Sequence, residues 1–287
     1  MSVMSARAWD QLWTWGMRLG GWLSGGALLW LVGTVFWQAM PAIKRYGWTF
    51  LTSQVWILDT EEFGGLAFIF GSLVSSACAL ALALPLGIGI GILTSRQLPL
   101  IPPILRTIAQ SLMVVMTTIP SVIIGLWGLT LLVPIFGASM FCAILVLTLM
   151  ITPTIAEVCR SAYDEFPILL RNSSIALGLT FWETLWQLYI PANLSATLSA
   201  GVLALGRALG ETMAVTMVIG NPTRPSVNWS LFAPAATIPS LLANQFGEAF
   251  MPIHISALMY LALVLFLMTT IANLLALLIR SRLVWRG

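Results

Sequence analysis

Long stretches without a charged residue are the feature that most constrains this chain. No Asp, Glu, Lys or Arg occurs from Leu19 to Ile43, from Phe63 to Ser95 or from Thr107 to Ala156. A helix needs about 20 apolar residues to cross the hydrocarbon core of a bilayer. Each interval is therefore long enough for at least one membrane-spanning helix.

The composition excludes several classes of protein. Hydrophobic residues make up 59% of the 287 and charged residues only 8%, whereas a soluble domain is about 25% charged. A water-soluble enzyme, a disordered chain and a nucleic-acid binder are excluded on this ground. Cys78, Cys142 and Cys159 lie far apart in apolar runs, and His254 is the single histidine. We expect free thiols and no Cys/His metal site.

The apolar intervals predict an all-α polytopic membrane protein with six transmembrane helices. The segment Pro134–Ser139 divides the longest interval, because proline and glycine end helices. A secretory signal is the alternative for the first interval, but the run is too long for a signal core. The predicted spans are Leu19–Met40, Leu66–Leu93, Ile108–Val133, Met140–Cys159, Leu194–Ile219 and Ile255–Ile279.

The basic residues predict the orientation. If the N-terminus is cytoplasmic, nine arginines lie on the inner side and three basic residues on the outer side, which is the bias expected of membrane proteins. We therefore expect both termini in the cytoplasm. The inner residues are Arg7, Arg18, Arg96, Arg106, Arg160, Arg171, Arg280, Arg282 and Arg286, and the outer ones are Lys44, Arg45 and Arg224.

The sequence lacks the residues for nucleotide or metal-dependent catalysis. A phosphate-binding loop needs a lysine after a glycine-rich turn, and the single lysine, Lys44, has no such turn before it. A metalloprotease motif needs two histidines. We therefore expect no catalytic residue, cofactor or metal in this chain, and any ATP and Mg²⁺ to be bound by a partner.

The inner loop of residues 160–193 has more structure than a passive linker. Pro167 follows two acidic residues, which is typical of a helix start. A second amphipathic run covers Thr180–Leu188, with Trp182 and Trp186 four residues apart. On these residues alone, the segment could equally lie on the inner membrane surface.

The spacing within this loop resembles a known motif. Gly178 is followed thirteen positions later by Pro191, which resembles the "EAA" loop of the permease subunits of ABC importers. In that family the loop carries a coupling helix that docks on a cytoplasmic ATPase. Asn172-Ser173-Ser174 stand here at the positions of Glu-Ala-Ala. The resemblance implies roles in ATPase coupling for Arg171, Asn172, Gly178, Trp182 and Pro191.

A second resemblance is more specific. The segment Gly206–Val215, continued by Ile219–Asn221, closely resembles the signature of PstC-type permeases of phosphate-specific importers. Five further segments are similar to the same family: Phe63–Gly65, Gly71–Ser76, Ile119–Ser121, Gly125–Leu129 and Leu242–Phe246.

This resemblance implies the fold, the partners and the function. The fold would be the type I ABC importer (MetI-like) permease fold, with an N-terminal segment, span and outer loop at residues 1–62 and a permease core at 63–287. The partners would be a homologous PstA-type permease, a PstB-type ATPase dimer and a PstS-type phosphate-binding protein outside the bacterial inner membrane. The chain would translocate inorganic phosphate.

Two charges inside the fifth predicted span are candidate functional residues. Arg207 and Glu211 are four residues apart and so are expected to share one helix face. A charge near the bilayer centre costs roughly 2.5–3.5 kcal/mol on the insertion scale, so such residues face a bundle interior or a wet cavity. One interpretation is a structural ion pair, and the other is a phosphate pathway in which the guanidinium binds the anion.

Other functions stay open on the residues alone. The chain could be the permease of another oxyanion importer, for sulfate, molybdate or phosphonate. It could also be an anion channel or carrier that needs no ATPase. A membrane enzyme is disfavoured because only one histidine and one lysine are present. His254, at the outer end of the sixth span, is expected at the surface or the membrane interface.

Overall fold

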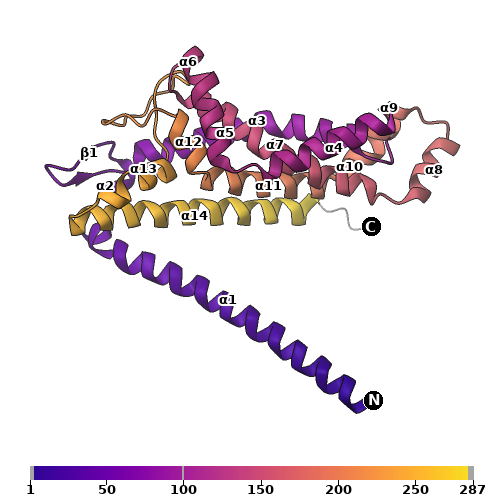
Figure 1. Ribbon diagram of the computed structural model, residues 1–287, viewed down its shortest axis with the longest axis horizontal. Helices are drawn as coiled ribbons and strands as arrows, with labels where there is room; N and C mark the ends of the chain where they lie inside the picture. Colours follow the sequence, from indigo (N-terminus) through magenta and orange to yellow (C-terminus); the bar gives the residue numbers. More distant parts are fainter. Residues whose placement is uncertain (1–2, 99, 284–287) are drawn as a thin grey trace.

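The computed structural model describes residues 3–98 and 100–283, and it is mostly helical (Figure 1). Arg286, counted above for the orientation, lies outside the described residues. The long helices are α1 (Val3–Tyr46), α3 (Leu66–Thr94), α4 (Pro103–Thr118), α7 (Met140–Asp164), α11 (Leu194–Gly210) and α14 (Pro252–Leu283). The shorter elements are α2 (Thr49–Thr52), β1 (Trp56–Ile57), β2 (Glu62–Phe63), α5 (Ser121–Trp127), η1 (Gly128–Leu132), α6 (Val133–Phe136), α8 (Ile168–Ala176), α9 (Phe181–Thr184), η2 (Leu185–Tyr189), α10 (Ile190–Ala192), α12 (Met213–Val218), α13 (Ile238–Gln245) and η3 (Phe246–Glu248).

Four of the six predicted spans are confirmed as single helices, α1, α3, α7 and α14. Each has a segment of at least 24 residues that is apolar enough to cross a membrane. Within the described part of the chain, the number of spans reaches six if each of two bent helix pairs is counted as one. Helix length and composition therefore agree with the predicted polytopic fold.

The third predicted span is not one straight helix, and this prediction is corrected. Helix α4 ends at Thr118 and α5 starts at Ser121, and the two halves meet at an angle of 99°. Proline lacks a backbone N–H and disfavours helical geometry in the residue before it. Ile119, which precedes Pro120, is accordingly extended with ψ 127°.

The fifth predicted span, Leu194–Ile219, is also broken. Helix α11 ends at Gly210, Glu211 is extended with ψ 120°, and α12 begins only at Met213. At its other end α11 forms a bent pair with Phe181–Ala192, at 63°. The helical path therefore starts earlier in the chain and stops earlier than the predicted span.

Helices α3 and α7 form the centre of the bundle, and glycines allow their close approach. A Cβ built on Gly87 would lie 2.6 Å from a methyl carbon of Ile155, and one on Gly91 would lie 2.8 Å from Cβ of Cys159. Small residues four apart let membrane helices pack backbone to backbone. Gly87 and Gly91, four residues apart, form a pair of this kind.

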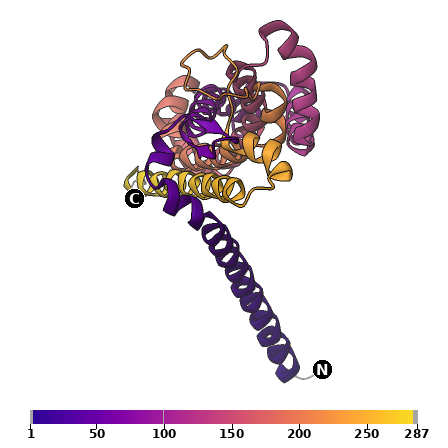
Figure 2. The same cartoon turned by 90° about the vertical axis from the view of Figure 1, so that its left-hand side faces the viewer.

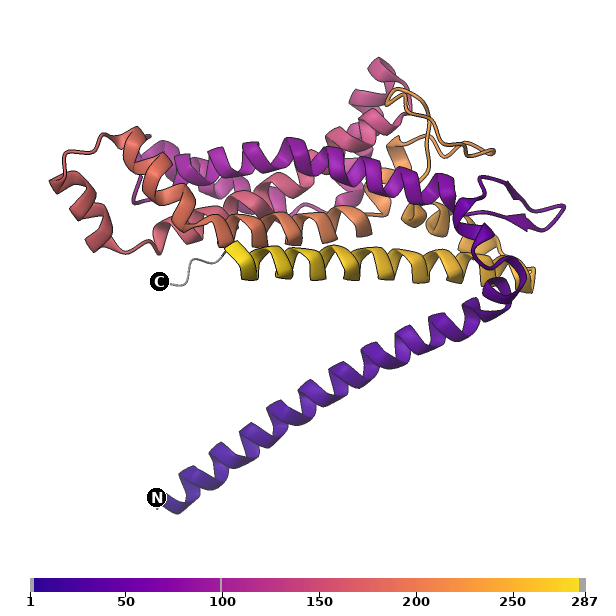
Figure 3. The same ribbon diagram turned by 180° about the vertical axis from the view of Figure 1, so that it is seen from behind.

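Helix α1 contacts the bundle near the helix's own C-terminal end, beside α14, and the rest of it points away from the other helices (Figures 1 and 3). There the amide of Ala42 donates a 2.9 Å hydrogen bond to Oγ of Ser256 in α14. Just beyond the helix, the ring of Phe50 stacks on Tyr260 of α14 with centroids 4.3 Å apart. Figure 2 shows the rest of α1 extending away from the other helices.

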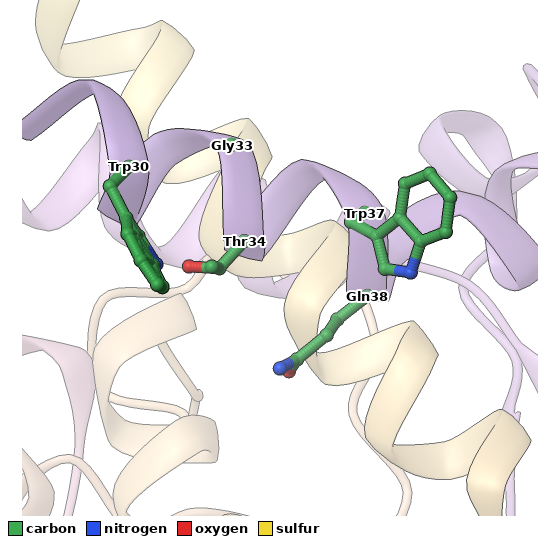
Figure 4. Close-up of a pocket in the computed structure, with 5 residues that line it drawn as sticks. All are labelled: Trp30, Gly33, Thr34, Trp37 and Gln38. Carbon is green, nitrogen blue, oxygen red and sulfur yellow. The ribbon is translucent and has the colours of Figure 1, made fainter.

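A hollow along α1 is lined by residues of that helix alone: Trp30, Gly33, Thr34, Trp37 and Gln38 (Figure 4). A ligand site needs walls from opposed elements that bury most of the ligand. This hollow has one wall and contains no charged residue. We therefore interpret it as the uneven surface of a lipid-facing helix.

The loop between α1 and α3 forms a small aromatic cluster with the start of α14. Trp56 and Phe63 pair across the β1–β2 hairpin, and the ring of His254 stacks on Phe63 at 5.4 Å. Gln245 accepts hydrogen bonds at its Oε1 from Trp56 Nε1, at 2.9 Å, and lies 3.0 Å from His254 Nε2. His254 is buried, so the prediction of a surface histidine was wrong.

The structure predicts that Gly71→Ala destabilises the protein. Its Cβ would lie 2.1 Å from the backbone oxygen of Ala236, and overpacking of this kind costs about 1–3 kcal/mol. Gly89→Ala is the matched control, because no atom lies within 4 Å of its Cβ position in the same helix. Thermal unfolding in detergent should show a lower Tm for Gly71→Ala only, and equal Tm values for the two variants would contradict the packing described.

Candidate functional site

Two interrupted helices lie side by side in the bundle. Helix α5, just after the break at Ile119–Pro120, packs against α12, just after the break at Glu211–Thr212. The contact is close, since a Cβ on Gly125 would lie 2.8 Å from Cα of Ala214. Membrane proteins tolerate interrupted helices where other protein groups or a water-filled cavity satisfy the freed backbone. In transporters, such breaks mark substrate and ion sites.

Arg207 and Glu211 do not form an ion pair with each other, although Arg207 lies in the last turn of α11 and Glu211 follows that helix directly. The guanidinium Nη1 of Arg207 donates to Oγ1 of Thr154 in α7, at 3.3 Å. Oε1 of Glu211 is 3.5 Å from the amide nitrogen of Ala214. The expectation of a shared helix face was wrong, because the helix ends before Glu211. Among the described salt bridges, none includes either residue.

Glu211 lines a narrow crevice that contains several hydroxyl groups. Ser72, Ser75 and Ser76 of α3 line it together with Thr237, the N-cap of α13. The crevice has no room for a water molecule. In the sequence these serines appear only within Gly71–Ser76, one of the segments similar to PstC-type permeases. Their closeness to Glu211 depends on contacts between distant segments and had no local signal.

The segment of residues 160–193, which we call the coupling loop after the role that the resemblance predicts, folds into short helices around a glycine turn. Gly178 adopts φ +76°. The amide of Leu179 donates to the carbonyl oxygen of Ser174 at 3.1 Å, and that of Gly178 to Ile175 at 3.0 Å. These are the two hydrogen bonds of a Schellman motif. The residue after the helix in this motif has a left-handed backbone conformation, which glycine adopts at no steric cost.

The second helix of the coupling loop begins with a capping box. Thr180 and Glu183 each accept a hydrogen bond from the other's backbone amide. Hydrogen bonds from Thr180 lower the pKa of the Glu183 carboxyl, and the bond from the hydroxyl contributes more than the bond from the amide. A π-helical turn, η2, then leads into α10, which contains Pro191.

The coupling loop presents a largely apolar surface. Of the residues implicated from sequence, Arg171 is half-buried, while Asn172, Gly178, Trp182 and Pro191 are exposed. Soluble surfaces rarely expose a large contiguous apolar patch unless it contacts another protein or a membrane. Exposed large apolar side chains here are Ile168, Leu169, Leu170, Ile175, Leu177, Trp182 and Trp186.

This architecture and this loop match a family of transport proteins. The family described as binding-protein-dependent transport system inner membrane component matches residues 83–284. The chain belongs to this family. The match includes the coupling loop, both helix breaks and α14, and leaves α1 outside.

Within the family, the chain belongs with the phosphate transport system permease proteins PstC. It is 36% identical to the PstC protein of Mesorhizobium japonicum over 274 residues, covering 86% of this chain and 81% of the relative. It is 33% identical to a probable PstC protein of Methanocaldococcus jannaschii, covering 89% and 88%. The PstC protein of Pasteurella multocida is 36% identical, with 80% and 78% covered.

Solved structures confirm the MetI-like fold. A chain of the MetNI methionine ABC transporter in an inward-facing conformation superposes with a TM-score of 0.64 at 16% identity. The superposition covers 76% of this chain and 95% of that one. At this level of identity the likeness concerns the fold alone. The family match and the PstC relatives make the chain a membrane component of an ABC transporter, as the sequence resemblance implied.

The glycine turn yields a test at Gly178. Substitution to Val should open the turn, because a β-branched residue is strongly disfavoured at positive φ. Asn, which tolerates this conformation, is the matched control. Amide hydrogen exchange over residues 168–184 should rise in Gly178→Val and stay near wild type in Gly178→Asn. Equal exchange in both variants would show that the turn does not depend on a left-handed residue.

Proposed function

We propose that this chain is a permease subunit that imports inorganic phosphate across the bacterial cytoplasmic membrane, with energy from a partner ATPase. The observation that carries the proposal is its similarity to PstC phosphate transport permeases along more than three-quarters of both chains, as in the 36% identity over 86% of this chain and 81% of the Mesorhizobium relative. A non-catalytic role fits, because ATP hydrolysis would reside in the partner.

The coupling loop supports dependence on an ATPase. Its exposed apolar residues lie on two short helices whose relative orientation is fixed by the Gly178 turn and the Thr180–Glu183 capping box. A preformed apolar surface can bind a protein groove without first ordering itself. We assign Arg171, Asn172, Gly178, Trp182 and Pro191 to this contact with a PstB-type ATPase dimer.

Further partners complete the proposed importer. A homologous PstA-type permease would pair with this chain, and a PstS-type binding protein would deliver phosphate to the outer loops. The inner side would hold the coupling loop and both termini. Phosphate selection would rest mainly with the binding protein, while this chain provides passage and coupling.

The geometry of Arg207 supports a role in the pathway. Its side chain is exposed and makes one described hydrogen bond, to Thr154, so most of its five N–H donors are available. Because Glu211 does not pair with it, its positive charge can attract an anion. A guanidinium offers two parallel donors to a phosphate. Glu211, next to the serine crevice, would line the same passage and limit how tightly an anion is held.

Reconstitution tests the proposed function. Proteoliposomes with this chain, the sister permease, the ATPase and the binding protein should accumulate labelled phosphate only when ATP is supplied to the ATPase side. Competition by sulfate, molybdate or phosphonate stronger than by phosphate would contradict the substrate assignment. Uptake by this chain without the ATPase would contradict the energy coupling.

Substitution of Arg207 tests the pathway. Arg207→Lys keeps the charge and loses the two-pronged donor, so we expect phosphate uptake to fall by about tenfold, the effect of losing 1–2 kcal/mol from a charged hydrogen bond. Arg224→Lys, in the outer loop, is the matched control and should transport normally. Complex yield should be unchanged in both. Normal uptake by Arg207→Lys would contradict the proposed role, and loss of assembly would favour a structural one.

A further inference from the structure

A cluster of polar and aromatic residues closes the base of the coupling loop, where its two ends approach each other. The cluster consists of Gln97, Asp164, Phe166 and Tyr189, which we call the base clamp. Asp164 is the last residue of α7, near the start of the loop, whereas Tyr189 is the last residue of η2, near the loop's other end. Gln97 belongs to neither end, and lies three residues beyond Thr94, the last residue of α3. Three separate segments therefore meet at one side chain.

The amide of Gln97 uses all its main hydrogen-bonding groups at this point. Its Nε2 donates to the backbone oxygen of Asp164 at 2.7 Å and to that of Phe166 at 2.8 Å. Its Oε1 accepts from the phenol of Tyr189 at 3.2 Å. Glutamine has two side-chain N–H donors and one carbonyl. Leucine, of similar size, could make none of these bonds.

Neighbouring contacts fix both sides of the clamp. The carboxylate Oδ1 of Asp164 accepts from Oγ of Ser95 at 2.8 Å and from the amide of Arg96 at 2.7 Å. Its Oδ2 accepts from Nη1 of Arg160 at 3.1 Å. The ring of Tyr189 is fully buried and lies 4.4 Å from that of Phe166. Both ends of the loop are thus joined to the end of α3.

We propose that Gln97 is a positioning residue that makes the coupling loop and α3 move as one body, so that displacement of the loop is passed to the bundle centre. This deepens the proposed function and rests on it for the source of the displacement. Helix α3 packs closely on α7 and contributes the serines of the crevice beside Glu211. The clamp therefore connects the loop surface with the helix that lines the candidate passage.

A transport measurement tests the role with a matched control. In the reconstituted complex, Gln97→Leu should lower phosphate transported per ATP hydrolysed by about fivefold or more, because it removes three hydrogen bonds and the net loss of one alone corresponds to about a fivefold change. Gln110→Leu is the control: Gln110 of α4 donates to the carbonyl of Thr94 at 2.9 Å, so the change removes a similar bond near the same end of α3 without touching the loop. A normal ratio in Gln97→Leu, or an equal fall in Gln110→Leu, would overturn the proposal.

A milder variant keeps the test decisive if Gln97→Leu fails to assemble. Tyr189→Phe removes only the bond from the phenol to Gln97 and keeps the buried ring. We expect a smaller fall in transport per ATP with normal complex yield. No fall in that ratio would then overturn the proposal.

A structural readout separates this inference from the proposed function, because it needs neither phosphate nor partners. Spin labels at Ala176 of α8 and Leu86 of α3, both exposed, would report their separation in the purified chain with its native cysteines replaced. The distance distribution should be narrow with Gln97 and broad in Gln97→Leu, while Gln110→Leu stays narrow. Equal widths for all three would overturn the clamp even if phosphate uptake occurs. Absence of uptake with the expected widths would instead contradict the proposed function.

Discussion

The close contact between α3 and α7 is the constraint on which the rest of the structure depends. In a membrane, lipid chains are as apolar as leucine, so helices associate through packing and hydrogen bonds rather than through the hydrophobic effect. Gly87 and Gly91 bring the two backbones together. Thr148 of α7 adds a hydrogen bond to the carbonyl of Ala79, at 3.4 Å. This pair gives the interrupted helices a rigid surface to pack on.

The interruptions are possible only because of that surface. A helix break inside hydrocarbon exposes amides and carbonyls that lipid cannot satisfy. Here α5 and α12 lie against each other and against α7, and Arg207 reaches Thr154 of the same helix. The proposed passage and the stable bundle would therefore use the same central helices. In our proposal, the base clamp adds the connection from this centre to the coupling loop.

Much of the helical architecture could be predicted from the sequence, because the length of a charge-free interval is set by the thickness of the bilayer. Intervals with uniform composition, such as that of α3, gave accurate bounds. Pro120 marked one possible break, but its 99° bend depends on what α5 packs against. The break at Glu211 has no proline. Glutamate and threonine are compatible with a helix, so tertiary contacts decide the conformation there.

The candidate site shows the same division. Gly178 and Pro191 were singled out because their spacing resembles a loop of ABC importer permeases, and the positive φ of Gly178 gives a local reason for the glycine. Arg207 and Glu211 were found because charges are rare in a span, but their separation could not be known without the break. The roles of Gln97 and His254 depend on residues in other elements of the fold. A glutamine or a histidine in a sequence does not indicate which residues it will contact. The sequence predicts features that depend on the type of a residue and its near neighbours, but not contacts between residues far apart in the chain.

Helix α1 contrasts with the rest of the chain. No residue of its most apolar stretch is buried inside the described structure, and its described anchors gather in its last turns beside α14. Selection on such a segment acts on hydrophobic length and on the residues of the anchor. Substitutions among apolar residues should therefore accumulate freely over most of the helix. Comparison of close orthologues should find this the fastest-drifting part of the protein, apart from Ala39 and Ala42, which are buried at its attachment.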